Sequence, residues 1–373
     1  MNYQKNIYFV SAARIPSRKA HTVSIIKMCE AFREQGFQVT LVIPSYKHII
    51  PKILFRKYGV SYPFNIHAVS VPNITFFPSS MRDFILRMVF ALRAWYFIQK
   101  DKHRVVITRD WFLLFFFKGV IFLHGRPSFG RRMWKRRLSR TSVIVVVNSI
   151  IKGLLIEKGI LREKIIVAPN GVNIGVFNIN ISQEAARSKV EIPKNDHIVM
   201  YTGSFYLYDW KGIDVLLDSI EHLAIECTVV LIGGSRAEIE SIKKIYNHKN
   251  LMLVEHVPHS DIPFYLKSAN VLVLPNTGDS RRGSHYTSPV KLFEYMASGV
   301  PIVASQLPAI TKILNNKNAC LVEPGNPKAL ARGITKVIQD REYADIRAEQ
   351  AFLDVQQYTW KARAQKIINV IPE

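Results

Sequence analysis

The chain has 373 residues, 48% of them apolar, which is enough for two or three globular domains with sizeable cores. Its longest apolar run, residues 111–123, is too short for a membrane span of about 18 residues, and the N-terminus lacks the layout of a signal peptide. Cys29, Cys227 and Cys320 form no CxxC pair, which predicts reduced core thiols in a cytosolic protein rather than a disulfide framework or a metal site.

The first half of the sequence alternates short, β-branched strands with helices. Strands are predicted at 7–11, 39–44, 66–71, 105–108, 120–124 and 143–148, with helices at about 19–35 and 81–102 and a further one from residue 150. These strands are continuously apolar, which is typical of parallel strands that are buried on both faces of a sheet.

The second half repeats the same alternation. Strands are predicted at 198–203, 228–233, 251–257, 271–275, 302–305 and 320–323, and helices at 213–223, about 237–246, 342–358 and 360–371. The fold class is therefore α/β, with two Rossmann-like domains that each contain a parallel sheet and face a cleft. We expect one domain at residues 1–175, onto which a C-terminal helix at 359–373 returns, and a second domain at 176–358.

Positive charge is concentrated in the first half of the chain. Residues 1–180 hold 29 Lys and Arg residues against 7 Asp and Glu, a net charge of +22, whereas residues 181–373 hold 22 against 21, a net charge of +1. A generally basic proteome would raise both halves alike. The asymmetry indicates that one half faces an anionic partner, such as a membrane surface, a nucleic acid or a phosphate-bearing substrate.

The stretch SPVKLFEYMASGVPIVAS, residues 288–305, predicts a helix that begins at a loop and ends at Gly299 before a buried strand. We expect Ser288 to cap this helix and Pro289 to take its first position, so that free backbone N–H groups and Lys291 form a phosphate site. Glu294 lies among apolar residues and needs hydrogen-bond donors. The hydroxyl groups of a ribose would serve, and a nearby arginine or backbone amide is the alternative.

A second stretch, YTGSFYLYDWKG at residues 201–212, contains a strand that breaks at Gly203 and a loop that leads into a helix. Gly203 would let the backbone approach a ligand closely. Lys211 would lie at the carboxyl end of this strand, where ligands bind in such folds. Together with the helix start near Ser288 it would form half of a diphosphate clamp, although a lone lysine before a helix is more often solvated. The backbone at Val257 would hold a base, with a plain loop as the alternative.

These two stretches and HVPHSDIPFYLKSANVLVLP occur in an order and spacing that resemble the retaining GT-B glycosyltransferases, known as glycosyl transferases group 1, of the family 4 type. The first half is similar too, through SAARIPSRKAHTVSIIKMCEAFREQGFQVTLVIPS, VVITRD, VIFLHG and APNGVN. The resemblance covers nearly the whole chain. It implies a nucleotide-diphosphate sugar held mainly by the second domain, an acceptor on the first, and transfer with retention of the anomeric configuration.

Carried over by position, the resemblance implies that Lys211 contacts the donor diphosphate, Glu294 the ribose and His124 the transferred sugar, although a satisfied core histidine is the alternative for His124. The implied donor-binding residues are Gly203, Ser204, Lys211, Val257, Ser288, Pro289, Val290, Lys291, Leu292 and Glu294. The sequence departs from the family pattern at two positions. Ser204 stands where the family often has an arginine, for which Arg281, Arg282 or Lys291 would substitute, and Tyr286 stands where the family often has a glutamate.

No carboxylate is placed as an obvious nucleophile, which favours front-face attack in which the departing diphosphate takes the acceptor proton. Stabilising the charge on that diphosphate is then the main catalytic need. The sequence has no DxD motif, so neither a metal nor another cofactor is expected. Four basic residues at or beyond predicted strand ends are acceptor-side candidates, with plain surface charge as the alternative: Arg14, His21, Arg109 and Arg126.

Two stretches combine basic and apolar residues, as expected at an anionic bilayer surface, where each cation contributes up to about 1 kcal/mol. The first is a long helix over 79–104, and the second is RRMWKRRLSR at residues 131–140. The alternative is a solvated basic face or a loop that touches an anionic acceptor. The membrane-facing candidates are Arg131, Arg132, Trp134, Arg136 and Arg137.

The sequence therefore predicts a bacterial hexosyltransferase of cell-envelope polysaccharide synthesis, peripheral on the inner face of the cell membrane. Its partners would be a nucleotide sugar, a lipid-linked or polysaccharide acceptor and an anionic membrane surface. A GT-B nucleotide-sugar epimerase is the first alternative, because it would use the same nucleotide clamp without an acceptor site. A nucleic-acid-binding protein is a weaker alternative, because no nucleic-acid motif accompanies the basic stretches.

Overall fold

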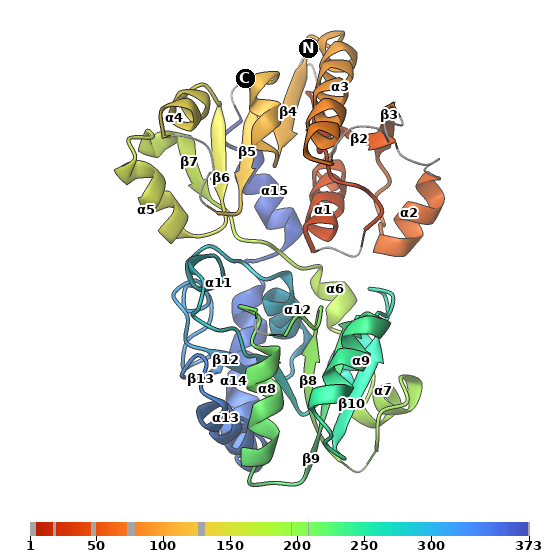
Figure 1. The fold of residues 1–373 in the computed structure, drawn as a ribbon, viewed down its shortest axis with the longest axis vertical. Helices are drawn as coiled ribbons and strands as arrows, with labels where there is room; N and C mark the ends of the chain where they lie inside the picture. The colour runs from red at the N-terminus through yellow and green to blue at the C-terminus, as the bar shows by residue number, and fades with distance from the viewer. Residues whose placement is uncertain are drawn as a thin grey trace. The chain divides into compact units, whose positions relative to one another are not determined.

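The computed structural model describes residues 5–17, 20–45, 50–72, 79–125, 131–194, 196–207 and 209–371. The chain divides into two compact units, which are treated separately below (Figure 1). Unit 1 consists of Met1–Pro169 and Trp360–Glu373, and unit 2 of Asn170–Thr359. None of the described helices has both the length and the apolar character that crossing a bilayer requires.

Unit 1 is built on a parallel sheet of seven strands in the order β3-β2-β1-β4-β5-β6-β7. Its strands are β1 (Asn6–Val10), β2 (Gln38–Ser45), β3 (Asn65–Ser70), β4 (Arg104–Thr108), β5 (Val120–Leu123), β6 (Val143–Val146) and β7 (Ile165–Val167). The helical segments are α1 (Ala20–Glu34), α2 (Pro51–Tyr58), α3 (Ser79–Gln99), η1 (Trp111–Phe115), α4 (Arg131–Ser139), α5 (Ser149–Glu157), η2 (Arg162–Lys164) and α15 (Trp360–Ile368). The six predicted strands are confirmed. The seventh, β7, was not predicted.

Unit 2 contains a parallel sheet of six strands in the order β10-β9-β8-β11-β12-β13. The strands are β8 (His197–Thr202), β9 (Cys227–Gly234), β10 (Leu251–Glu255), β11 (Val271–Leu274), β12 (Ile302–Ser305) and β13 (Cys320–Val322). The helical segments are α6 (Ile174–Phe177), α7 (Gln183–Lys189), α8 (Ile213–Asp218), η3 (Ser219–His222), α9 (Arg236–Ile245), α10 (Ile262–Ser268), α11 (Arg281–His285), α12 (Val290–Ser298), α13 (Pro327–Gln339) and α14 (Arg341–Val355). All six strands were predicted, whereas α6, α7, α10, α11 and α13 were not.

Each sheet has a point at which the strand order reverses. In unit 1 it lies between β1 and β4, and in unit 2 between β8 and β11. Connections leave such neighbouring strands in opposite directions, so a crevice opens at their carboxyl ends, where ligands of open parallel sheets bind. The central strands are rigid, because every residue of β11 is buried and β8 is buried from Ile198 onward. The loops after β8 and β11 are therefore held on a fixed frame.

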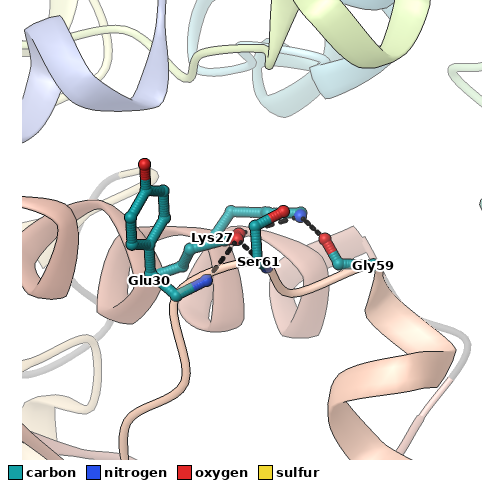
Figure 2. A network of polar contacts seen from close by, with 5 residues as sticks. Lys27, Glu30, Gly59 and Ser61 are labelled. Carbon is teal, nitrogen blue, oxygen red and sulfur yellow. Dashed lines mark hydrogen bonds and ion pairs between the residues drawn. The ribbon is translucent and has the colours of Figure 1, made fainter.

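A buried ion pair ties α1 to the loop that follows α2 (Figure 2). Lys27 and Glu30 are 6% and 7% exposed, and the Lys27 ammonium lies 2.8 Å from Glu30 Oε2. Lys27 Nζ also donates to the Gly59 carbonyl at 2.6 Å, and the backbone N–H of Ser61 donates to Glu30 Oε1 at 2.5 Å. Because both charges are paired and hydrogen-bonded, they fix the position of this loop against the helix.

Replacing Glu30 by alanine would leave Lys27 buried without its counter-ion. We expect the Glu30→Ala change to lower the free energy of unfolding by about 3 kcal/mol, measured by chemical denaturation. The exposed pair between Lys243 and Glu240, at 3.7 Å, provides the control. Glu240→Ala is expected to change stability by less than about 1 kcal/mol, and an equal loss in both variants would contradict a special role for the buried pair.

Candidate functional site

The carboxyl ends of β8 and β11, at the reversal point of the unit 2 sheet, bring together the residues that the sequence analysis singled out. The β8 strand is followed directly by Gly203, whose φ of 138° is one that residues with a side chain rarely adopt. A Cβ atom at this position would lie 3.2 Å from Lys291 Nζ and 3.1 Å from the Tyr201 hydroxyl. The glycine therefore leaves the space in which the Lys291 ammonium lies against the strand end.

The side chain of Lys291 in unit 2 has an unusual environment for a lysine. Its Nζ atom is buried and has no hydrogen-bond partner among the residues that the structure describes. It lies 3.6 Å from the centre of the Tyr201 ring. Burial, and then the neighbouring Lys211 ammonium, hold the pKa of Lys291 well below its usual value, although the Glu294 carboxylate opposes this. A buried amine without a partner is costly, so this position favours an incoming anion.

Lys211 brings a second cation to the same place. Its ammonium donates to Ser204 Oγ, directly after Gly203, and lies 4.2 Å from the centre of the Tyr206 ring. Burial lowers the pKa of Lys211, while Asp209 and Glu238 act in the opposite direction. In the described part of the chain, neither Lys211 nor Lys291 has a carboxylate within 4 Å of its ammonium. Two neighbouring lysines without an ion-pair partner are candidates for an anion site.

One of the three residues proposed to substitute for the family arginine at Ser204 lies near that position in the structure. Three basic residues were considered as substitutes, and the ammonium of Lys291 lies against Gly203. Arg281 is exposed, and the side chain of Arg282 lies outside the described residues. Tyr286, at the position of the family glutamate, is half-buried with its ring 6.2 Å from that of His285.

The start of α12 differs from the expectation. The helix begins at Val290 with Pro289 as its cap residue, and no side chain caps it. The prediction that Ser288 caps the helix is therefore wrong, because Ser288 Oγ accepts from the backbone N–H of Asn170 at 3.2 Å. The Ser288 carbonyl also accepts from Asn170 Nδ2 at 2.6 Å. Ser288 thus holds the loop before α12, and the first amide groups of the helix lack a side-chain acceptor.

Glu294 lies one turn into α12 and is 6% exposed. Its Oε1 atom lies 2.8 Å from His259 Nε2, so its partner is neither the arginine nor the backbone amide considered from the sequence. The His259 side chain is 25% exposed, and its ring meets that of Phe177 edge-on at 5.6 Å. His259 was not predicted. It fixes one oxygen of the carboxylate, Oε1.

The loop after β11 adds polar atoms that the sequence analysis did not single out. Asn276 Oδ1 and Thr277 Oγ1 are buried and have no hydrogen-bond partner within the described ranges. The loop is fixed by the Thr277 N–H, which donates to the Trp210 carbonyl at 3.0 Å. Gly212 lies so close to Pro275 that a Cβ atom would be 1.9 Å from the Pro275 carbonyl oxygen. Val257, proposed as a base contact, is half-buried against the core of unit 2.

Unit 1 has a separate cluster of basic residues at the carboxyl ends of β4 and β5. His124 Nε2 is buried without a hydrogen-bond partner in the part of the chain that the structure describes. Burial, and then Arg109, Arg363 and His21, hold the pKa of His124 well below its usual value, so its imidazole is neutral. Burial lowers the pKa of Arg109 to about 10 and that of Arg363 to about 9.

The acceptor-side candidates differ in their surroundings. Arg109 donates from Nη1 to the His21 carbonyl at 3.3 Å, which places both residues in this cluster. Arg14 is exposed, and Arg126 lies outside the described residues. Arg363 on α15 was not predicted, although it is 4% exposed and lies 5.3 Å from the centre of the Phe122 ring. It joins the cluster from the far end of the sequence.

The basic stretch at 131–140 forms α4, and the prediction that Trp134 faces a membrane is wrong. Trp134 is 4% exposed and Leu138 is fully buried, so Trp134 faces the core and not a membrane. Arg136 is exposed, and the guanidinium of Arg137 lies 4.1 Å from the centre of the Phe115 ring. The side chains of the two remaining candidates, Arg131 and Arg132, are outside the described part.

Comparison with known proteins decides the family. The sequence profile of glycosyl transferases group 1 matches residues 196–340, and that of glycosyltransferase family 4 matches residues 21–176. This chain belongs to the glycosyl transferases group 1 family. The two matches lie in different units of this group 1 protein, so both units carry the family pattern.

Known relatives agree with this assignment. The group 1 chain is 24% identical over 389 residues to a phosphatidyl-myo-inositol mannosyltransferase of Mycobacterium leprae, with 93% of this chain and 91% of the relative covered. It spans 54%, 59% and 51% of the lengths of three other curated relatives that it matches.

Solved structures confirm the GT-B fold. Sucrose-phosphate synthase from Thermosynechococcus elongatus superposes with a TM-score of 0.77 at 19% identity, covering 98% of each chain. HepE from Anabaena, in a complex with UDP and glucose, gives a TM-score of 0.76 at 16% identity and covers 98% of this chain and 99% of its own. The group 1 protein therefore has two Rossmann-like domains of the GT-B type.

Proposed function

We propose that this chain is a retaining hexosyltransferase that uses a nucleotide-diphosphate sugar. The acceptor would be a lipid-linked or polysaccharide intermediate of the bacterial cell envelope. The observation that carries the proposal is the pair of ammonium groups of Lys211 and Lys291 at the carboxyl end of β8. The complex of HepE with UDP and glucose supports a nucleotide-sugar donor, because that protein shares the fold.

The geometry of unit 2 suits the stabilisation of a leaving diphosphate. Lys211 and Lys291 would contact its oxygens, and the amide groups at the start of α12 would add partial positive charge. Negative charge grows on the diphosphate as the glycosidic bond breaks, so preorganised cations lower the barrier. The proposed attack from the front face then lets a diphosphate oxygen take the proton of the acceptor hydroxyl. Because the lysines supply the charge and the sequence has no DxD motif, the proposal includes no metal.

Glu294 would accept hydrogen bonds from the ribose hydroxyl groups. His259 holds Oε1, which leaves Oε2 for the nucleotide. A buried carboxylate with one donor has unused acceptor capacity, and a pair of hydroxyl groups fits it. The backbone near Val257 belongs to the same proposal as the contact for the base.

Unit 1 would supply the acceptor side. We assign contact with the transferred sugar to His124, because its neutral imidazole has an unused polar atom. Arg109, His21, Arg14 and Arg126 are the proposed acceptor contacts. The net charge of +22 over residues 1–180 supports a position on the inner face of the cell membrane.

Calorimetric titration with UDP, GDP and ADP tests the donor site. Burial lowers the pKa of Lys291, and a bound diphosphate would raise that pKa again, so binding and protonation of this amine are linked. We therefore expect net proton uptake on binding, seen as different apparent enthalpies in phosphate and Tris buffers. Affinity should fall as the pH rises above the pKa of the empty site. Binding of none of these nucleotides would contradict the proposal.

A second measurement separates transfer from epimerisation. The protein is incubated with the sugar donor of whichever nucleotide binds, with and without a polyprenyl-diphosphate glycan acceptor. Nucleoside diphosphate released only with acceptor, and a product with the donor's anomeric configuration by NMR, would support a retaining transferase. Conversion of the donor sugar without acceptor would support the epimerase.

A further inference from the structure

The outer surface of α3 carries apolar side chains that no part of the described chain covers. Five residues form this surface, which we call the outer stripe, and their exposed fractions lie between 40% and 66%: Met81, Phe84, Leu92, Trp95 and Tyr96. They recur at the spacing of one helix face and extend over about 22 Å at 1.5 Å per residue. An apolar surface of this extent marks a contact site.

The opposite face of α3 anchors the helix in unit 1. Phe90, Ala94 and Ile98 are buried and pack with Val10, Val106 and other residues of the sheet. This packing fixes the helix from Leu86 to Ile98, and the outer stripe cannot turn inward without its loss. The exposure of the stripe is a fixed property of the fold.

The apolar surface continues from α3 to α4 through aromatic contacts. The Phe84 ring meets that of Phe112 edge-on at 5.9 Å, and Phe112 lies 6.1 Å from Phe115, which is 38% exposed. The Arg137 guanidinium of α4 lies 4.1 Å from the centre of the Phe115 ring. Met133, on the same helix, is 44% exposed. One surface thus runs across three elements of unit 1.

Cations flank the outer stripe. Arg82, Arg93 and Lys100 follow one another at spacings of 11 and 7 residues, which places them along one side of the helix. The Lys100 ammonium lies 4.9 Å from the centre of the Tyr96 ring, at the edge of the stripe. Arg136 extends the positive charge on α4, and Asp83 is the one acidic residue within α3.

We propose that the outer stripe, with Phe115 and Met133, is a docking surface for an anionic lipid bilayer. The inference deepens the proposed peripheral location, on which it rests. A surface helix with an exposed apolar face that is flanked by Arg and Lys has the character of helices that insert into the interface of a bilayer. The charge of unit 1 favours anionic lipid over a neutral partner. It also corrects the expectation from the sequence, because α4 contributes charge and Met133, whereas its tryptophan is buried.

Co-sedimentation with vesicles tests the docking surface. Wild-type protein is expected to bind vesicles of phosphatidylcholine and phosphatidylglycerol, and to bind phosphatidylcholine alone more weakly. Phe84→Ser combined with Trp95→Ser should lower the partition coefficient by about tenfold or more. Arg82→Gln combined with Lys100→Gln should lower it by a similar factor at low salt, at about fivefold per cation.

A matched control uses apolar residues of unit 2. Ile346 and Leu353 on α14 are 56% and 57% exposed, so Ile346→Ser combined with Leu353→Ser removes a similar apolar area elsewhere. This control is expected to bind vesicles as wild type does. Affinity for UDP, which we assign to unit 2, should be unchanged in every variant, and an unchanged far-UV circular dichroism spectrum shows that each one is folded. If the protein binds UDP but not vesicles, the docking proposal fails and the donor-site proposal stands. If it binds vesicles but not UDP, the donor-site proposal fails and the docking proposal stands.

Fluorescence gives a second readout. Trp95 is 40% exposed, and brominated lipids should quench its emission on binding, whereas Trp95→Phe should remove the quenched component. Vesicle binding that is equal in wild type and in the Phe84→Ser and Trp95→Ser variant would overturn the proposal. A second result would also overturn it. If the wild type forms a dimer in sedimentation and binds no vesicles, and if this variant abolishes the dimer, the face joins two copies of the chain.

Discussion

Replacing Lys211 by alanine should lower kcat/KM for sugar transfer by about 100- to 1000-fold. Lys211 donates to Ser204 at the end of β8 and would point its charge at the diphosphate. A preorganised cation acts most strongly on the charge that develops in the transition state, and removal of one such contact costs about this factor. Steady-state assay of acceptor-dependent nucleotide release measures the effect.

Two controls separate this role from general effects of charge. Lys243→Ala removes a lysine with a 61% exposed side chain on α9 and is expected to leave kcat/KM unchanged. Lys211→Arg keeps the cation but alters its shape, and it should recover part of the activity. Near-wild-type turnover in Lys211→Ala would exclude the diphosphate contact.

The change Glu294→Gln should raise the Kd for the nucleotide diphosphate by about 10- to 100-fold. The substitution keeps the volume of the side chain but removes the charge that strengthens hydrogen bonds from ribose hydroxyl groups. Such charged hydrogen bonds contribute about 1.5 to 3 kcal/mol. Isothermal titration calorimetry measures the Kd, and thermal unfolding shows whether the buried contact with His259 still forms.

The nucleotide lacking both ribose hydroxyl groups makes this test specific. Wild-type protein should bind the 2′,3′-dideoxy form more weakly than the normal nucleotide, whereas Glu294→Gln should bind the two about equally. His259→Gln retains a donor toward Glu294 and is expected to keep the wild-type preference. If Glu294→Gln discriminates between the two nucleotides as well as wild type does, the carboxylate has another role.

Much of the fold was predictable because it depends on local pattern. Runs such as residues 271–274 are apolar at every position, and only a strand buried on both faces requires this. The strand β7 was missed, and the cap of α12 was predicted wrongly. Ser288 is used by Asn170, which lies 118 residues away in the sequence. Local rules for helix capping do not include so distant a competitor.

The charged residues of the candidate site could be identified from the sequence, but the side chains that they contact could not. Lys211 and Glu294 were identified from motif spacing, but the sequence left three residues as substitutes for the missing arginine at Ser204. The contact of Lys291 with Gly203 depends on how α12 packs against β8, which spacing does not reveal. His259 was not identified from the sequence because it lies in a loop, 35 residues from Glu294. Trp134 was misplaced although Leu138, four positions on, signals a buried helix face.

The position of Lys291 over the Tyr201 ring has a consequence for ligand binding. Because burial lowers the pKa of Lys291, the empty site carries less positive charge than the number of its lysines suggests. An anion bound beside this amine would raise its pKa again, so anion binding and protonation of Lys291 would be coupled. The positive charge of the site would thus depend on whether its ligand is present.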